Sequence, residues 1–199
     1  MAAANTFFEV DSSSPCIIRL VSPDNTNRLT RACVLLLTGK INALASNAQP
    51  LIIAGNHNFF SVGADLNEIA ALTGPEAYEF SQMGQTLMNA IAAFPAPVIA
   101  AIEGHCMGGG FDLALACHRR IAAPNAVFGH RGAALGLITG WGGTQRLPRL
   151  VGKGRALELF VAAEKVTAQH ALSIRLIDAI AHDPIAEAVH RLHFSPPAR

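Results

Sequence analysis

Three consecutive glycines, Gly108–Gly110, stand between a predicted apolar strand over 98–102 and a predicted apolar helix over 111–117, in IEGHCMGGGFDLALACH. Glycine is a poor residue for starting a helix, because it loses more conformational freedom on folding than any other residue. A bare backbone does allow a ligand to come close to the unpaired N–H groups of the first helical turn. The pattern therefore favours binding of an anion, or stabilisation of an oxygen that becomes negative during a reaction. Close packing of helix against strand is the structural alternative.

A second loop, NFFSVGADL at 58–66, follows an apolar strand predicted over 51–54. In a parallel sheet this loop and the glycine turn emerge at the same edge. One N–H from each, those of Ala64 and Gly109, would then form a pocket with two donors. No GxGxxG motif stands at this junction, and the sequence has no GxxxxGK[ST] and no GxSxG motif. Dinucleotide, P-loop and nucleophile-elbow sites therefore have no support.

Short apolar strands alternate with helices along the chain. Strands without polar alternation, separated by helices, indicate an α/β fold whose parallel sheet is covered on both faces. The predicted strands are 16–21, 51–54, 98–102, 120–123 and 176–181, and the predicted helices are 31–44, 75–94, 110–118, 167–174 and 184–193.

The composition is apolar and nearly neutral. Of 199 residues, 51% are hydrophobic and 15% charged, and the net charge is +1, which favours one domain with a large core or a subunit interface. Without a basic cluster, nucleic acid is not an expected partner. The N-terminal MAAANTFFEV has no cationic region, and there is no apolar run of membrane-spanning length, so we expect no membrane association and a cytoplasmic protein. The four cysteines lack metal-ligand spacing, so no metal is expected.

Taken in order, five segments of the chain resemble the crotonase superfamily, which includes the enoyl-CoA hydratases and isomerases. The resemblance covers residues 15–181 and implies a crotonase-like spiral of repeated strand–strand–helix turns. The segments are SPDNTNRL (22–29), LIIAGNHNFFSVGADL (51–66), PVIAAIEGHCMGGGFDLALACH (97–118), FGHRGAALGLITGWGGTQRLPRLVG (128–152) and AAEKVTAQHALSIRLIDAI (162–180).

The resemblance also implies a ligand, an acyl-CoA thioester whose carbonyl oxygen is held by the N–H groups of Ala64 and Gly109. Coenzyme A enters as part of the substrate, and no other cofactor is implied. A homo-oligomer, trimer or hexamer, is the implied assembly. The residues implied to bind the substrate are Asn25, Ala64, Asp65, Leu66, Asn67, Gly109, His130 and Gly132.

The sequence departs from the family at two places. The hydratases use two glutamates; Asp112 stands in place of the first, and Gly132, next to His130 and Arg131, in place of the second. The resemblance implies a C-terminal helical region, and we expect it to be largely missing here, because after the predicted core domain, 1–183, only a short helix and tail, 184–199, are expected. A more open pocket is expected.

The leading hypothesis is an enzyme that hydrates or isomerises an enoyl-CoA through an enolate, with Ala64, Gly109 and Asp112 as the catalytic set. The gap at Gly132 leaves two alternatives open. One is an acyl-CoA-binding protein with weak or lost catalysis. The other is a different crotonase reaction with a substituted base, as in the dihydroxynaphthoyl-CoA synthases, where a bound bicarbonate stands beside a glycine. The sequence does not choose among acyl groups.

Overall fold

The computed structural model describes residues 7–194, and of residues 133 and 194 only the backbone. Its strands form two sheets. The larger sheet contains, in spatial order, β1 (Phe8–Asp11), β2 (Cys16–Leu20), β3 (Leu51–Ala54), β5 (Val98–Ile102), β7 (Arg119–Ala122) and β10 (Ala179–Ile180). The smaller sheet contains β4 (Phe59–Ser61), β6 (His105–Met107), β8 (Val127–Gly129) and β9 (Val166–Thr167). Neighbouring strands are parallel except at β1–β2 and β8–β9.

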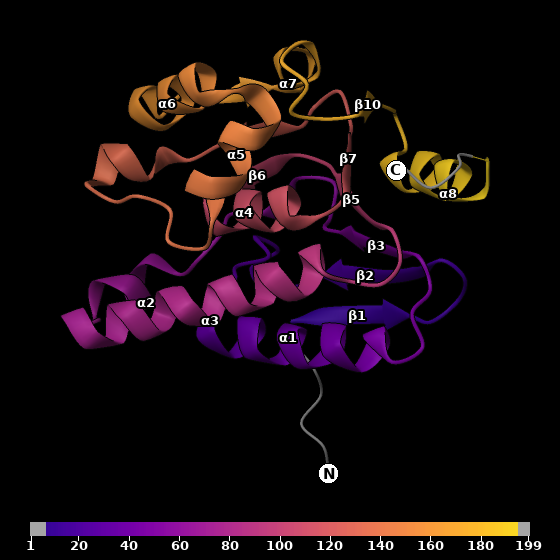
Figure 1. Ribbon diagram of the computed structural model, residues 1–199, viewed down its shortest axis with the longest axis horizontal. Coiled ribbons are helices and arrows are strands. Elements are labelled where there is room, and N and C mark those ends of the chain that lie inside the picture. The colour runs from indigo at the N-terminus through magenta and orange to yellow at the C-terminus, as the bar shows by residue number, and fades with distance from the viewer. Residues whose placement is uncertain (1–6, 195–199) are drawn as a thin grey trace.

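The helices cover these sheets in separate groups. Figure 1 shows α1 and α3 side by side along the lower part of the molecule, the group α5–α7 at the opposite end, and α8 apart from both. The helices are α1 (Arg31–Ala45), α2 (Leu66–Ala70), α3 (Gly74–Ala92), α4 (Gly109–Ala116), the 3₁₀ helix η1 (Arg131–Leu135), α5 (Gly143–Val151), α6 (Lys153–Ala162), α7 (Ala168–Ser173) and α8 (Pro184–Phe194).

The predicted spiral is confirmed. Three times in succession the chain forms a strand of the larger sheet, then a strand of the smaller sheet, and then a helical segment. These turns are β3–β4 with α2 and α3, β5–β6 with α4, and β7–β8 with η1 and α5. Each turn therefore delivers the loop that follows its smaller strand to the same edge of the smaller sheet.

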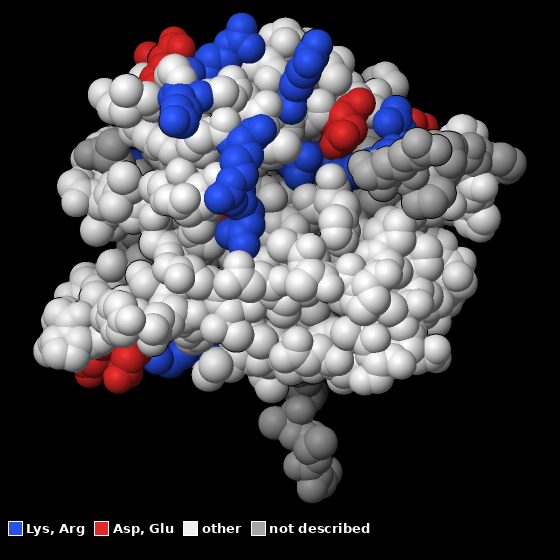
Figure 2. Space-filling model, viewed as in Figure 1, with Lys and Arg blue, Asp and Glu red and all other residues white. Residues whose placement is uncertain are grey.

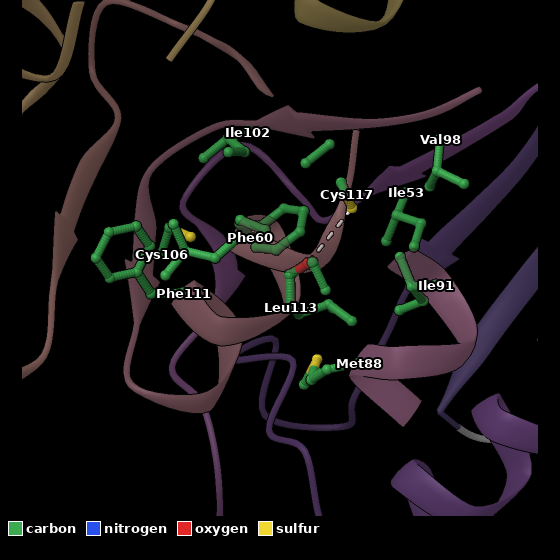
Figure 3. Packing of buried hydrophobic residues seen from close by; sticks show 14 of the residues in the cluster. Ile53, Phe60, Met88, Ile91, Val98, Ile102, Cys106, Phe111, Leu113 and Cys117 are labelled. Carbon is green, nitrogen blue, oxygen red and sulfur yellow. Dashed lines mark hydrogen bonds between the residues drawn. The ribbon is translucent and has the colours of Figure 1, made fainter. Parts of the chain in front are cut away.

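The larger sheet is buried on both faces, which explains the apolar runs without alternation. Every residue of β3 and β5 is buried. One face packs with α1, α3 and α4 into the main core, where Ile53, Val98 and Ile91 lie together (Figure 3). The other face packs against α8, whose Ala188 is fully buried in a second cluster. Among the described helices, α8 is the only one that contributes residues to this second cluster.

Helix α3 is an example of local sequence fixing an element that the site needs. Its start has a proline, Pro75, at the first helical positions, and the Glu76 carboxylate accepts a hydrogen bond of 2.8 Å from the Thr73 N–H. Both features stabilise a helix N-terminus. Phe80 and Leu87 point to the core from one face. The helix ends at Ala92, shortly before Pro95, the proline that was predicted to end it.

One part of the predicted connectivity is wrong. The strand over 98–102 does not run straight into the glycine turn, because β6 intervenes, and the loop at 62–65 follows β4 rather than β3. Strands of three residues are too short to show a period of two, so no local pattern marks the smaller sheet, and only the family resemblance implied a second strand in each turn. Helices α5 and α6 were also not predicted. The tail after residue 194 lies outside the described residues.

Charge is distributed unevenly over the surface. On the face in Figure 2, Lys and Arg gather over the part labelled α5 in Figure 1, while the surface over α1 carries almost no charge. Leu35 and Leu36 of α1 are more than half exposed. Within residues 7–194, none of the helices combines the length and apolar character needed to span a membrane.

Candidate active site

A cavity of about 340 Å³ opens between α3, the glycine turn and the segment that connects β8 to α5. Its wall is mostly apolar, with side chains such as Leu66, Phe80 and Ile138. Polar side chains also line it, among them Asp112, His130 and Thr139, together with Ser81 and Arg131. A mostly apolar pocket with a few converging polar groups is typical of a small-molecule site.

The two glycine-containing turns meet in the wall of this cavity. Strands β4 and β6 are parallel neighbours, so the loops that follow them emerge side by side. A Cβ atom added to Gly63 would lie 2.6 Å from the Gly109 nitrogen, and one added to Gly109 would lie 3.3 Å from the Ala64 nitrogen. Within residues 7–194, neither the Ala64 nor the Gly109 amide donates to a backbone carbonyl in a loop or turn. The structure therefore brings the two predicted donors together.

Trp141 gives a second reason for the bare backbone at Gly109. A Cβ atom on Gly109, or on Gly84 of α3, would overlap the Trp141 indole ring. The ring is 3% exposed, and its Nε1 donates a hydrogen bond of 3.2 Å to the Phe80 carbonyl oxygen. The indole is thus wedged between two helices against the glycine turn. The glycine at position 109 therefore serves both purposes: it allows close packing, which was the structural alternative, and it lies next to the Ala64 amide.

Asp112 lies in the first turn of α4 and is 1% exposed. The Thr139 hydroxyl donates a hydrogen bond to its Oδ2 atom. Burial raises the pKa of Asp112 to about 7, although the Thr139 hydroxyl and the Arg146 guanidinium act in the opposite direction. Desolvation favours the neutral form of a carboxyl group. Near neutral pH, this side chain can therefore both give and accept a proton.

His130 faces Asp112 across the cavity wall. Its Nε2 atom lies 3.4 Å from Asp112 Oδ1, and neither atom has a hydrogen-bond partner among the described residues. The imidazole lies between Phe111 and Phe160, with ring centroids 4.8 Å and 5.3 Å away. Burial lowers the pKa of His130 to about 4, so the ring is neutral at pH 7.

The predicted site residues fall into two groups. Six of them line the cavity: Ala64, Leu66, Gly109, Asp112, His130 and Gly132. Asn25, Asp65 and Asn67 do not. Asp65 caps α2 by accepting a hydrogen bond of 2.8 Å from the Asn67 N–H, and Asn25 is in a left-handed turn with a φ of 58°. Their contact with coenzyme A stays a prediction.

Sequence reasoning missed two side chains of the site, Thr139 and Phe160, whereas it expected Trp141 to line or pack beneath the glycine turn around it. Neither Thr139 nor Phe160 belongs to a motif, and Phe160 lies on α6, a helix that was not predicted. The sequence signal nearest to them is GWGGTQRL at 140–147, a second glycine-rich turn that leads into α5. That turn carries Gly143, where an added Cβ atom would overlap Asp112 Oδ1.

A family model described as enoyl-CoA hydratase/isomerase matches residues 11–193 of the chain. The chain belongs to the enoyl-CoA hydratase/isomerase family. This confirms the resemblance to the crotonase superfamily that the sequence motifs indicated.

The chain is also similar to individual proteins and solved structures. A protein named "probable enoyl-CoA hydratase" from Bacillus subtilis (strain 168) is 44% identical over 147 residues, which are 73% of this chain and 57% of that protein. The chain thus matches little more than half the length of this relative. Among solved structures, an enoyl-CoA hydratase from Bacillus anthracis is 36% identical with a TM-score of 0.83, covering 94% of this chain and 72% of that one. DspI from Pseudomonas aeruginosa is 31% identical with a TM-score of 0.90, covering 99% and 84%.

Proposed function

We propose that this chain binds an acyl-CoA thioester and catalyses proton transfer next to the thioester carbonyl, so that an enoyl-CoA is hydrated or its double bond is shifted. One observation carries the proposal: a mostly apolar cavity contains two neighbouring backbone amides, those of Ala64 and Gly109, together with the buried carboxyl group of Asp112. Each part supports one requirement of the reaction.

The two amides would hold the thioester oxygen. When a proton leaves carbon 2, or water adds to carbon 3, negative charge moves onto this oxygen and forms an enolate. Backbone donors that are already in place stabilise such charge without reorganising, and losing one donor typically costs about 10²- to 10³-fold in rate. The apolar wall, with Leu66 and Ile138, would accommodate the acyl chain.

Asp112 would carry the proton. A general acid or base works best when its pKa is close to the pH of the reaction, and burial brings the pKa of Asp112 to about 7. As the only carboxylate among the described residues that line the cavity, Asp112 is the group that the proposal assigns to this step.

A second candidate function is acyl-CoA binding with little turnover. It is favoured by the place where the family has its second glutamate, because Gly132 carries no side chain there. A Cβ atom at Gly132 would lie 2.9 Å from the Leu137 carbonyl oxygen, so the loop is built tightly around glycine. The Leu137 N–H also donates a hydrogen bond of 2.8 Å to the Gly132 carbonyl oxygen.

Contact of Asn25, Asp65 and Asn67 with the coenzyme A moiety, and assembly into a homo-oligomer, belong to the same proposal. Leu35 and Leu36 on the outer side of α1 support association, because exposed apolar side chains over a surface with little charge favour burial in an interface. Sedimentation of the purified chain tests this part directly, and a monomer at micromolar concentration would contradict it.

The central experiment measures three properties of the full chain. Hydration of but-2-enoyl-CoA and hex-2-enoyl-CoA is followed by loss of the absorbance of the conjugated thioester. Exchange of the carbon-2 protons of butanoyl-CoA is followed by NMR in deuterium oxide, and binding of a butyl-CoA thioether by calorimetry. Turnover or exchange supports the enzyme, binding alone supports the second candidate, and the absence of all three contradicts both.

Two glycine variants test the role of the amides. Gly109→Ala introduces a methyl group that overlaps Trp141 and approaches the Ala64 nitrogen, so we expect at least a 100-fold loss of turnover. The matched control is Gly154→Ala in α6, where an added Cβ atom has no neighbour within 4 Å. Circular dichroism establishes that both variants are folded. Equal turnover in both variants would contradict the assignment of the Gly109 amide.

A further inference from the structure

We propose that His130 is the second proton-carrying residue of this site, and that Asp112 and His130 hold one proton between them and act as a single unit. The inference rests on the proposed function and deepens it, since it names a catalytic residue where the family pattern has a carboxylate and this chain has none.

The geometry singles out these two side chains. Three buried side-chain N or O atoms lack a hydrogen-bond partner in the described part of the chain: Asn27 Oδ1, Asp112 Oδ1 and His130 Nε2. Two of the three face each other at 3.4 Å in the wall of the cavity. A buried polar atom without a partner costs about 1–3 kcal/mol, so a proton held between these two atoms would satisfy both at once.

The pair is held in place from several sides. The Thr139 hydroxyl occupies Asp112 Oδ2, which leaves Oδ1 directed toward His130. Phe111 and Phe160 fix the plane of the imidazole ring. Within residues 7–194, His130 Nδ1 forms no hydrogen bond, and His130 lines the cavity, so Nδ1 is the ring nitrogen that remains to accept a proton from a ligand.

Few other charged groups face the pair. Arg146 on α5 acts on Asp112 and favours its ionised form. Arg131, the residue after His130, lines the same cavity. On the inner side, Cys106 of β6 interacts electrostatically with Asp112, but burial raises the pKa of that thiol well above its ordinary value, so it stays neutral. Asp112 and His130 are therefore the two groups that would exchange a proton in the cavity wall.

The exchange of protons balances over one reaction cycle. At the start Asp112 is ionised, His130 carries its proton on Nε2, 3.4 Å from Asp112 Oδ1, and Nδ1 has a free electron pair. As the oxygen of a water molecule bonds to carbon 3, its O–H bond breaks, Nδ1 takes the proton, and the electron pair of the double bond moves to the thioester oxygen as an enolate. The shared proton moves toward Asp112 Oδ1. Carbon 2 of the enolate then takes one proton from the pair, which returns to its starting state.

Isomerisation uses the same unit. A C–H bond of the reactant breaks, its proton goes to the pair, and the electron pair forms the enolate; another carbon of the conjugated system then takes the proton back. In both reactions the pair gains one proton and loses one, so no second carboxylate is required. A positioned general acid or base contributes about 10²- to 10⁴-fold.

The test compares His130→Phe with a matched control. Phenylalanine keeps a ring between Phe111 and Phe160 but has no nitrogen. The control is His105→Phe, since His105 is a half-buried histidine that also stacks on a phenylalanine, Phe59, at 5.4 Å, and it does not line the cavity. We expect kcat/KM to fall by about 10²- to 10⁴-fold in His130→Phe, with binding of the butyl-CoA thioether within a few-fold, and to stay within about threefold in His105→Phe.

An NMR titration separates this inference from the proposed function. The ¹⁵N shifts of the His130 imidazole should move near pH 7, where Asp112 titrates, and this movement should be absent in Asp112→Asn. A folded His130→Phe with turnover within threefold of the wild type would overturn the catalytic role. His130 shifts that are the same in the wild type and in Asp112→Asn would overturn the shared proton. If the wild type turns over no acyl-CoA, the proposed function and the catalytic role of His130 both fail, while the titration still decides whether the pair shares a proton.

Discussion

Replacing Asp112 by asparagine should make the protein more stable, and increasingly so as the pH rises. Burial raises the pKa of this carboxyl from 3.8 to about 7. The folded chain therefore binds more protons than the unfolded chain between these pH values, and the stability associated with Asp112 is complete below pH 4 and lost as the pH rises through 7. Three pH units of difference correspond to about 4 kcal/mol in total.

The contribution of Asp112 to the free energy of unfolding is measured between pH 5 and pH 9. Because the unfolded carboxyl is already mostly ionised at pH 5, integrating the proton uptake over this range leaves about 3 kcal/mol. The free energy of unfolding of Asp112→Asn, minus that of the wild type, should therefore increase by about 3 kcal/mol from pH 5 to pH 9. Urea unfolding gives both values, followed by the fluorescence of Trp141, the single tryptophan of the chain.

His130 changes the free energy of unfolding with pH in the opposite direction, so its contribution must be controlled. Burial lowers its pKa from 6.5 to about 4, so the unfolded chain binds more protons between these values and stability rises with pH there. The same comparison is therefore made in a His130→Phe background, which removes this contribution. If the difference between Asp112→Asn and its parent does not change with pH in that background, the buried, near-neutral carboxyl on which the proposed chemistry depends is wrong.

Two further predictions concern groups packed against the site. Trp141→Ala removes the ring that is wedged against Gly109, so it should lower the free energy of unfolding by about 3–5 kcal/mol and remove most of the turnover. Thermal or urea unfolding followed by circular dichroism measures the loss of stability. A loss of stability with full activity would show that the ring does not position the amide. Gly143→Ala places a methyl group onto Asp112 Oδ1 and 2.8 Å from His130 Nε2, so turnover should fall at least tenfold while Gly154→Ala, measured in parallel, keeps its activity. Unchanged turnover in Gly143→Ala would mean that the carboxyl can move without consequence.

Five of the six strands of the larger sheet could be predicted because each is encoded locally, while β1 was not predicted. The uniformly apolar LIIA and VIAAI match β3 and β5, whose residues are buried on both faces, and the proline that begins α3 lies where predicted. The smaller sheet could not be predicted, since its strands have two or three residues and are held by pairing between distant segments rather than by a local pattern.

By itself, the sequence determined the family, the bare turn at Gly108–Gly110, the acid at position 112 and the absence of a carboxylate at position 132. Each of these can be recognised from residue types that lie close together in the sequence. Only the tertiary structure decided which of the eight histidines stands beside Asp112, that Thr139 holds the other carboxylate oxygen, and that Trp141 packs onto Gly109. The reason is physical: burial and distance set the protonation of a carboxyl group, and both come from the packing of segments far apart in the chain.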